Sequence, residues 1–138
     1  MKIAVVSFIF LYLSVLACVG AAEINFKRAV QAKDVKRLKT AQRLNPFVSD
    51  YFYREYRLSG DLNRLVHAMS LEPTKAAYHM YYGLALLKRV KRTKTSDEEA
   101  VTEICRAARL KPYSEPYRSA CEKYKAVISI PDRKPYAP

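Results

Sequence analysis

The sequence predicts an all-α protein, in which an N-terminal transmembrane or signal helix precedes a short stack of antiparallel helix pairs. Residues 3–22 carry no charged side chain. A 13-residue pattern occurs three times, at residues 34–46, 61–73 and 100–112. These segments are rich in Leu, Ala, Arg and Lys, which favour helix, and the whole chain has only three glycines. Half of the residues are apolar, which is ordinary for a folded domain.

The uncharged N-terminal segment is long enough to cross a membrane. As a helix, its 20 residues rise about 30 Å, which matches the hydrocarbon core of a bilayer. Three interpretations are open: a retained anchor, a secretory signal cleaved before Glu23, and lipidation at Cys18, because "SVLAC" resembles a bacterial lipobox. The length exceeds that of a usual signal peptide and therefore favours the anchor.

Charges around the segment give conflicting signals about topology. Basic residues that begin with Lys27 and Arg28 follow it and favour a cytoplasmic C-terminal side, whereas the short basic start before a long apolar run favours export. We expect a single-pass membrane protein with its repeat domain on the exported, periplasmic side. The expected domains are an anchor or signal over residues 1–24, a repeat domain over 25–128 and an extended, proline-rich tail over 129–138.

The three repeated segments share apolar positions at helical spacing. A large apolar residue, an alanine and a closing proline recur in each copy: Leu38, Ala41 and Pro46; Leu65, Ala68 and Pro73; Ile104, Ala107 and Pro112. The spacing predicts a helix with one buried face, on which the small alanine lets a neighbouring helix come close. Each proline ends its helix, and five residues later Tyr51, Tyr78 or Tyr117 opens a second helical segment.

This alternation resembles the tetratricopeptide repeat, a 34-residue helix pair with small, apolar and proline positions in fixed order. Ala100, Ile104, Ala107 and Pro112 fill the second-helix positions, and Gly83 falls where the first-helix glycine belongs. The prolines are 27 and 39 residues apart, so one unit is shorter and one longer than the family pattern. The resemblance covers about residues 25–128, and a general stack of helical hairpins is the alternative.

The resemblance implies a concave groove, lined by the first helices, that grips a peptide. In that register six residues face the groove: Tyr53, Arg57, Met80, Leu84, Lys88 and Lys123. The alternative for each is ordinary packing between helices or a solvated basic face.

Local signals predict helix ends. Gly60 predicts the stop of one helix and Asp61 the N-cap of the next. Ser96 and Glu99 have the spacing of a capping box.

Cys105 and Cys121 lie eight residues before and eight after Tyr113, so a hairpin that turns near Tyr113 brings them side by side. They are expected either as a disulfide, which requires an oxidising compartment, or as two small buried thiols.

We find no pattern that would carry a reaction. His67 and His79 lack metal-ligand spacing and are expected as partly exposed helix residues, and no glycine-rich phosphate loop is present. No enzyme activity, metal or cofactor is expected. With 25 basic and 13 acidic residues, the chain suits anionic lipid or acidic proteins, and Lys88–Lys94 is the expected lipid contact. Nucleic-acid binding is not expected, because no reading element accompanies the basic segment.

The function expected from these features is a non-catalytic, membrane-anchored scaffold or adaptor, or an accessory subunit of a membrane complex. It would bind a partner protein through its repeat surface, and residues 3–22 would contact the bilayer. The alternative is an exported or lipid-anchored envelope protein that assists assembly of secreted polymers or surface structures. A membrane helix that runs into short repeats also resembles the C-terminal end of envelope polysaccharide polymerases and ligases.

Overall fold

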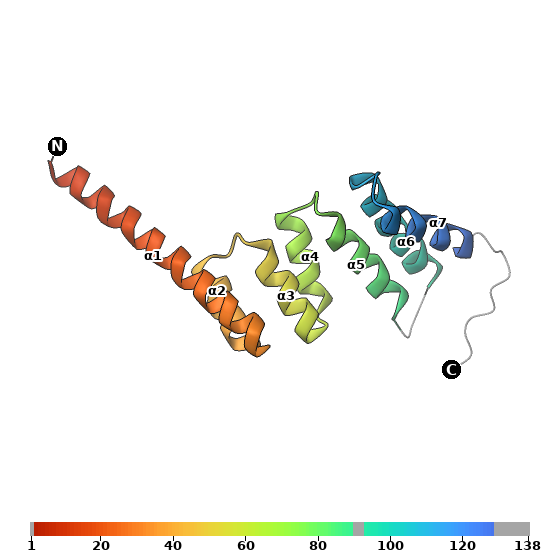
Figure 1. Cartoon of the computed structure of the whole chain (residues 1–138), viewed down its shortest axis with the longest axis horizontal. Helices are drawn as coiled ribbons and strands as arrows, with labels where there is room; N and C mark the ends of the chain where they lie inside the picture. Colours follow the sequence, from red (N-terminus) through yellow and green to blue (C-terminus); the bar gives the residue numbers. More distant parts are fainter. Residues whose placement is uncertain (1, 90–92, 129–138) are drawn as a thin grey trace. The chain divides into compact units, whose positions relative to one another are not determined.

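The computed structural model describes residues 2–89 and 93–128, and their regular structure is entirely α-helical, as the sequence predicts (Figure 1). The helices are α1 (Lys2–Ala32), α2 (Val35–Leu44), α3 (Ser49–Ser59), α4 (Leu62–Leu71), α5 (Ala76–Leu87), α6 (Lys94–Leu110) and α7 (Glu115–Ile128). The chain divides into two compact units. Unit 1 comprises residues 1–71 with α1–α4, and unit 2 comprises residues 72–138 with α5–α7. The expected tail at 129–138 lies outside the described residues.

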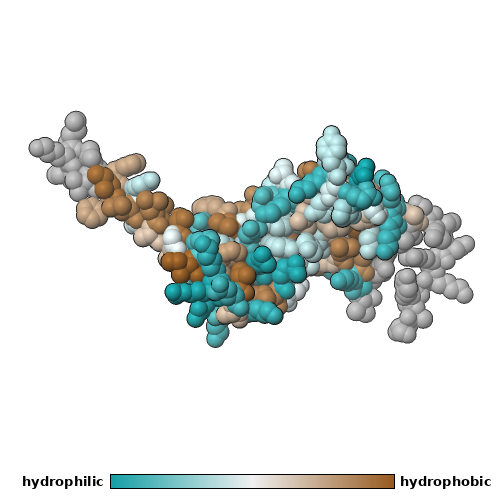
Figure 2. Space-filling model, in the orientation of Figure 1, coloured by the Kyte–Doolittle hydropathy of each residue, from teal (hydrophilic) through white to brown (hydrophobic). Residues whose placement is uncertain are grey.

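The apolar segment and the first helix of unit 1 are one continuous helix, α1, of 31 residues. By length and composition it can cross a membrane or serve as a signal sequence. Its apolar side chains are exposed from Phe8 to Val19, with Phe8 and Phe10 about 70% exposed (Figure 2). Its last part packs against α2 and fully buries Ala22 and Ala29. The expected boundary between residues 24 and 25 therefore lies inside a helix.

The repeated residues form the buried faces of α2, α4 and α6. All three large apolar positions and all three alanines are fully buried: Leu38, Leu65, Ile104, Ala41, Ala68 and Ala107. Each of these helices ends at a leucine two residues before its proline, because proline cannot continue a helix. The following tyrosines lie near the starts of α3, α5 and α7, and Tyr51 and Tyr78 are buried. The predicted helix boundaries are confirmed at these positions.

Capping residues mark the end of α3 and the starts of α4 and α6. Gly60 has the left-handed φ of 74° and ends α3, and Asp61 accepts the Asn63 N–H at the start of α4, both as predicted. The predicted capping box was misplaced. Thr93 is the N-cap of α6, and it exchanges hydrogen bonds with Ser96, which lies one turn inside the helix.

Gly83 marks the closest approach of α5 and α6 in unit 2. A Cβ atom at this position would lie 2.5 Å from the Ala100 carbonyl oxygen and 2.7 Å from Ile104 Cγ1. The two helices cross at a distance that leaves no room for a side chain, so the position requires glycine. The glycine that the sequence singled out therefore has a direct packing role.

Candidate partner-binding surface

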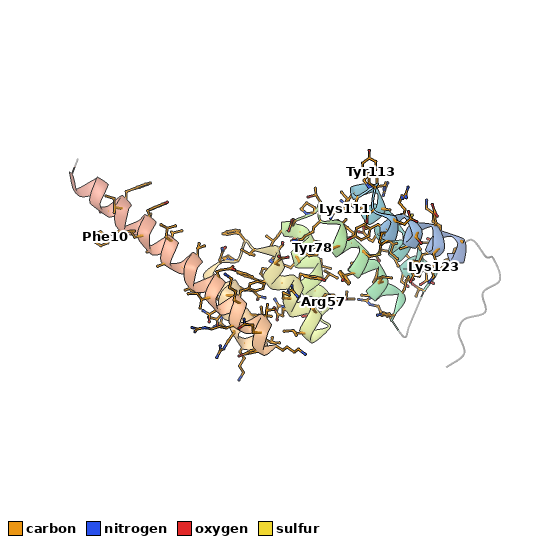
Figure 3. The ribbon with its side chains drawn as sticks, viewed as in Figure 1. Phe10, Arg57, Tyr78, Lys111, Tyr113 and Lys123 are labelled. Atoms are coloured by element: carbon orange, nitrogen blue, oxygen red, sulfur yellow. A yellow bond between two sulfur atoms is a disulfide. The ribbon has the colours of Figure 1, made fainter. Side chains whose placement is uncertain are left out.

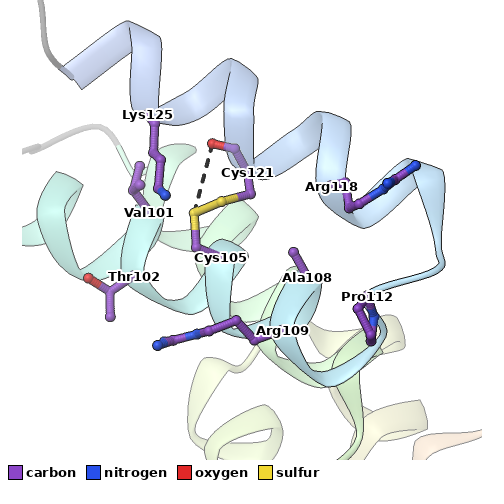
Figure 4. A pocket seen from close by; sticks show the side chains of 9 residues that line it. All are labelled: Val101, Thr102, Cys105, Ala108, Arg109, Pro112, Arg118, Cys121 and Lys125. Carbon is purple, nitrogen blue, oxygen red and sulfur yellow. Dashed lines mark hydrogen bonds between the residues drawn. A yellow bond between two sulfur atoms is a disulfide. The ribbon is translucent and has the colours of Figure 1, made fainter.

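A groove of about 490 Å³ lies between α6 and α7 in unit 2 (Figure 4). Its lining is made of apolar and basic side chains: Val101, Thr102, Cys105, Ala108, Arg109, Pro112, Arg118, Cys121 and Lys125. The two cysteines form a disulfide that joins α6 to α7, with their Cα atoms 4.7 Å apart. The disulfide thereby fixes the separation of the two helices that make the groove.

Three positive side chains surround this apolar centre. Arg109 comes from α6, whereas Arg118 and Lys125 come from α7. Figure 4 shows Lys125 directed from α7 towards α6, and Arg118 forms an ion pair with Glu115. The groove combines a small apolar surface with positive charge. That chemistry suits an acidic segment that also carries an apolar side chain.

This groove was not predicted from the sequence, although part of its lining has a regular helical spacing. Arg118, Cys121 and Lys125 follow the i, i+3, i+7 spacing that places residues on one face of a helix. Cys105 and Arg109 on α6 have the matching i, i+4 spacing. This spacing aligns the side chains within each helix, but it does not show that the two helix faces meet.

A buried polar pair holds α5 to α6 in the same unit. His79 is 2% exposed, and its Nδ1 lies 2.5 Å from Glu103 Oε2 on α6. Its Nε2 lies 2.8 Å from the Pro73 carbonyl oxygen, so both ring nitrogens face oxygen atoms that can accept hydrogen bonds. The prediction of a partly exposed His79 was wrong, because α6 covers the ring and supplies a carboxylate partner. His67 on α4 is exposed, as predicted.

The expected groove residues of unit 2 do not share one surface. Met80 was wrongly assigned to a binding face. It is 9% exposed and belongs to the core with Ala76, Ile104, Ala107 and Cys121. Leu84 packs against that core, whereas Lys88 and Lys123 are exposed. The helical register placed Met80 correctly on one side of α5, but that side is covered by α6.

In unit 1, Tyr53 and Arg57 lie one turn apart on α3. The Arg57 guanidinium donates to the Tyr53 hydroxyl at 3.0 Å, and its central carbon lies 5.9 Å from the Tyr53 ring centroid. Arg57 is exposed at the surface of unit 1 (Figure 3). The pair combines an aromatic ring with a positive charge at the surface, and Tyr and Arg are frequent in protein interfaces.

A second buried polar network stabilises unit 1 across three helices. Glu55 on α3 is 3% exposed and accepts a hydrogen bond of 2.7 Å from Gln42 Nε2 on α2. Arg64 Nε on α4 lies 3.4 Å from the other carboxylate oxygen of Glu55. A buried carboxylate requires such partners, and here they join α2, α3 and α4.

Two tyrosines pair with glutamates on neighbouring helices. Tyr51 on α3 donates to Glu23 on α1 at 3.4 Å, and Tyr82 on α5 donates to Glu99 on α6 at 2.9 Å. Burial, followed by the charge of Glu23, raises the pKa of Tyr51. Burial, followed by the hydrogen bond to Glu99, raises the pKa of Tyr82. Both phenols therefore stay neutral to higher pH than usual.

The remaining sites proposed from the sequence are not among the residues that line the groove. Cys18 is an exposed free thiol on α1. In the expected lipid-contact segment, Lys88 and Arg89 are exposed, residues 90–92 lie outside the described part, and Lys94 begins α6. Among the described residues, no three His, Cys, Asp or Glu side chains are arranged to hold a metal ion.

Comparison with known proteins adds no further assignment, since no protein family and no curated protein matches this chain.

Proposed function

We propose that this chain is a membrane-anchored, non-catalytic adaptor with a tetratricopeptide-like stack that holds a partner protein within a membrane complex. The observation that carries the proposal is the α6–α7 groove, in which basic side chains surround an apolar, disulfide-braced centre. Its occupant is an acidic segment of the partner that carries an apolar side chain. Support for the tetratricopeptide-like arrangement comes from the buried repeat positions and from the close crossing at Gly83.

The anchor is retained rather than cleaved. Ala22 is fully buried in a cluster with Ala41 and Tyr51, against which Phe26 packs. Cleavage before Glu23 would cut through α1 and remove Ala22 from this cluster. The packing of α1 therefore favours a helix that is at once the anchor and the first helix of unit 1.

The repeat units lie on the exported side of the membrane. Support comes from the disulfide between Cys105 and Cys121, because disulfides persist in oxidising compartments and are rare in the reducing cytosol. The exported side also fits a partner that works in the cell envelope.

The test is cross-linking of the groove to its partner in native membranes. A photoreactive amino acid at Thr102, which is exposed and lines the groove, should form a specific adduct with a membrane-complex protein. The double variant Arg109→Glu and Lys125→Glu should abolish that adduct, because it reverses the charge offered to the acidic segment.

Lys39→Glu is the matched control, since Lys39 is an exposed lysine on α2 of unit 1. Lys39→Glu changes the net charge by the same amount as each substitution in the groove. It should leave the adduct in place, because Lys39 does not line the groove. If the groove variant retains the full adduct, or if Lys39→Glu removes it as effectively, the groove is not the binding site.

A competing expectation for the basic surface is contact with anionic lipid through Lys88–Lys94. Lipid contact through exposed charges weakens steeply with salt, whereas an apolar groove contact persists. At high salt we expect only a partial loss of the adduct, because screening weakens the charge contribution whereas the apolar contact persists. Complete loss of the adduct in salt, together with binding of unit 2 to anionic vesicles, would support the lipid interpretation instead.

A further inference from the structure

The turn between α2 and α3 carries an exposed aromatic side chain, Phe47, which is 81% exposed. Asn45 Oδ1 accepts the Phe47 N–H at 3.4 Å and shapes the turn. The apolar residues on either side, Leu44 and Val48, pack inward against the cluster of Ala22, Ala41 and Tyr51. The fold therefore places Phe47 outside the core although its neighbours lie against it.

That cluster fixes where the turn lies along α1. Ala22 is the last residue of the uncharged stretch that begins at residue 3, and the next residue, Glu23, accepts a hydrogen bond from Tyr51. Figure 1 shows the α2–α3 connection leaving beside the C-terminal half of α1. Phe47 thus lies near the level of α1 where the uncharged stretch ends.

The chemistry around this level is that of a membrane surface. Apolar side chains are exposed on α1 up to Val19 and Ile24. Exposed basic side chains begin just beyond, at Lys27 and Arg28 on α1, and α2 adds Arg43 in its last turn. Exposed aromatic residues next to a span, flanked by basic residues, suit the boundary between hydrocarbon and anionic headgroups.

We propose that the α2–α3 turn is a membrane-contact site, in which Phe47 inserts into the interface of the bilayer that α1 crosses. Arg43, in the last turn of α2, lies in the headgroup layer, farther from the hydrocarbon core than Phe47. This inference rests on the proposed anchor and extends it, because it assigns a second, separate point of lipid contact. Two contacts from one unit hold α2 and α3 close to the membrane surface.

The chain contains no tryptophan, so a single introduced tryptophan reports on one position. The Phe47→Trp variant is reconstituted into phosphatidylcholine–phosphatidylglycerol vesicles with lipids brominated either near the headgroup or near the chain end. We expect blue-shifted emission and several-fold stronger quenching by the shallow bromine than by the deep one. Because Phe47 is exposed and outside the core, the substitution leaves the fold intact, and circular dichroism checks this.

Two further variants separate the possible failures. Phe10→Trp reports on the span, and Tyr113→Trp reports on a turn aromatic that also follows a proline but lies in unit 2, where it is 98% exposed (Figure 3). If the Phe10→Trp variant is quenched but the Phe47→Trp variant emits as in water, the interface contact is wrong and the anchor stands. If the Phe10→Trp variant is not quenched, the proposed membrane anchor and the proposed contact of Phe47 with the bilayer are both wrong. If the Tyr113→Trp variant is quenched as strongly as the Phe47→Trp variant, the contact is not specific to the α2–α3 turn and the inference fails.

Discussion

Replacing Gly83 with alanine puts a methyl group into the crossing of α5 and α6. The new Cβ would lie 2.5 Å from the backbone oxygen of Ala100 and 2.7 Å from Ile104 Cγ1, both well inside normal contact distance. The Ile104 side chain can rotate away at some cost, but the Ala100 carbonyl belongs to the α6 backbone and can move only if the helix moves. The substitution therefore forces α5 and α6 apart.

Two opposing effects determine how much Gly83→Ala changes the free energy of unfolding. Overpacking a tight core costs about 1–3 kcal/mol, and contact with backbone places this site in the upper half of that range. Alanine in place of glycine inside a helix returns about 1 kcal/mol of helix stability. The expected net decrease in the free energy of unfolding is about 1–2 kcal/mol. In a unit of this size, each kcal/mol lowers the melting temperature by about 4–8 °C.

The assay is urea and thermal unfolding of the full chain in detergent, followed by circular dichroism. The control is the pair Ser119→Gly and Ser119→Ala, since Ser119 is an exposed position on α7 of the same unit. The difference in stability between these two variants measures only the difference in helix propensity between glycine and alanine. If Gly83→Ala stabilises the protein by the same amount as this control step, the close crossing does not exist and the packing argument is refuted.

Three further predictions concern other contacts. His79→Phe should cost about 2–3 kcal/mol, because it leaves Glu103 and the Pro73 carbonyl without their buried partner; urea unfolding measures this, and a neutral effect would contradict the pairing. Reduction of the disulfide between Cys105 and Cys121, 16 residues apart, should destabilise unit 2 by about 3 kcal/mol, while the Cys105→Ser, Cys121→Ser variant should show no response to reductant. Because the pKa of Tyr51 is raised in the folded state, the unfolded state loses this proton first, so stability should fall as pH rises above about 10. Tyr51→Phe should flatten that alkaline loss, and an unchanged pH profile would show that Tyr51 does not contribute.

The helical architecture was predictable because its signals are local and repeated. Three copies of one apolar pattern mark the buried faces of α2, α4 and α6, and a proline follows each helix end. The resemblance to a helical repeat singled out Gly83 without predicting its contact, and the structure shows a close approach of α6 at this position. The misplaced cap of α6 shows the limit of local signals, since both Thr93 and Ser96 are competent N-caps and only the start of the helix decides between them.

The polar networks and the groove were not predictable from local pattern. His79 and Glu103 are 24 residues apart, and Gln42 and Glu55 are 13 apart, so their pairing depends on how whole helices pack. Met80 was assigned to a binding surface from the register of the resemblance, which does not show that other helices cover this side of α5. Arg118 and Lys125 become a site only when the cysteine pair sets α7 beside α6.

The most direct test of the account is the intact mass of the protein taken from its native membrane without reductant. A retained anchor and an oxidised unit 2 predict a mass that includes residues 1–22 and is lower by two hydrogens, from the bond between Cys105 and Cys121. A mass that begins at Glu23 would contradict the anchored adaptor and show that α1 is cut as a signal sequence. A mass that begins at Cys18 with an added lipid would contradict the membrane-spanning helix and support the lipid-anchored alternative.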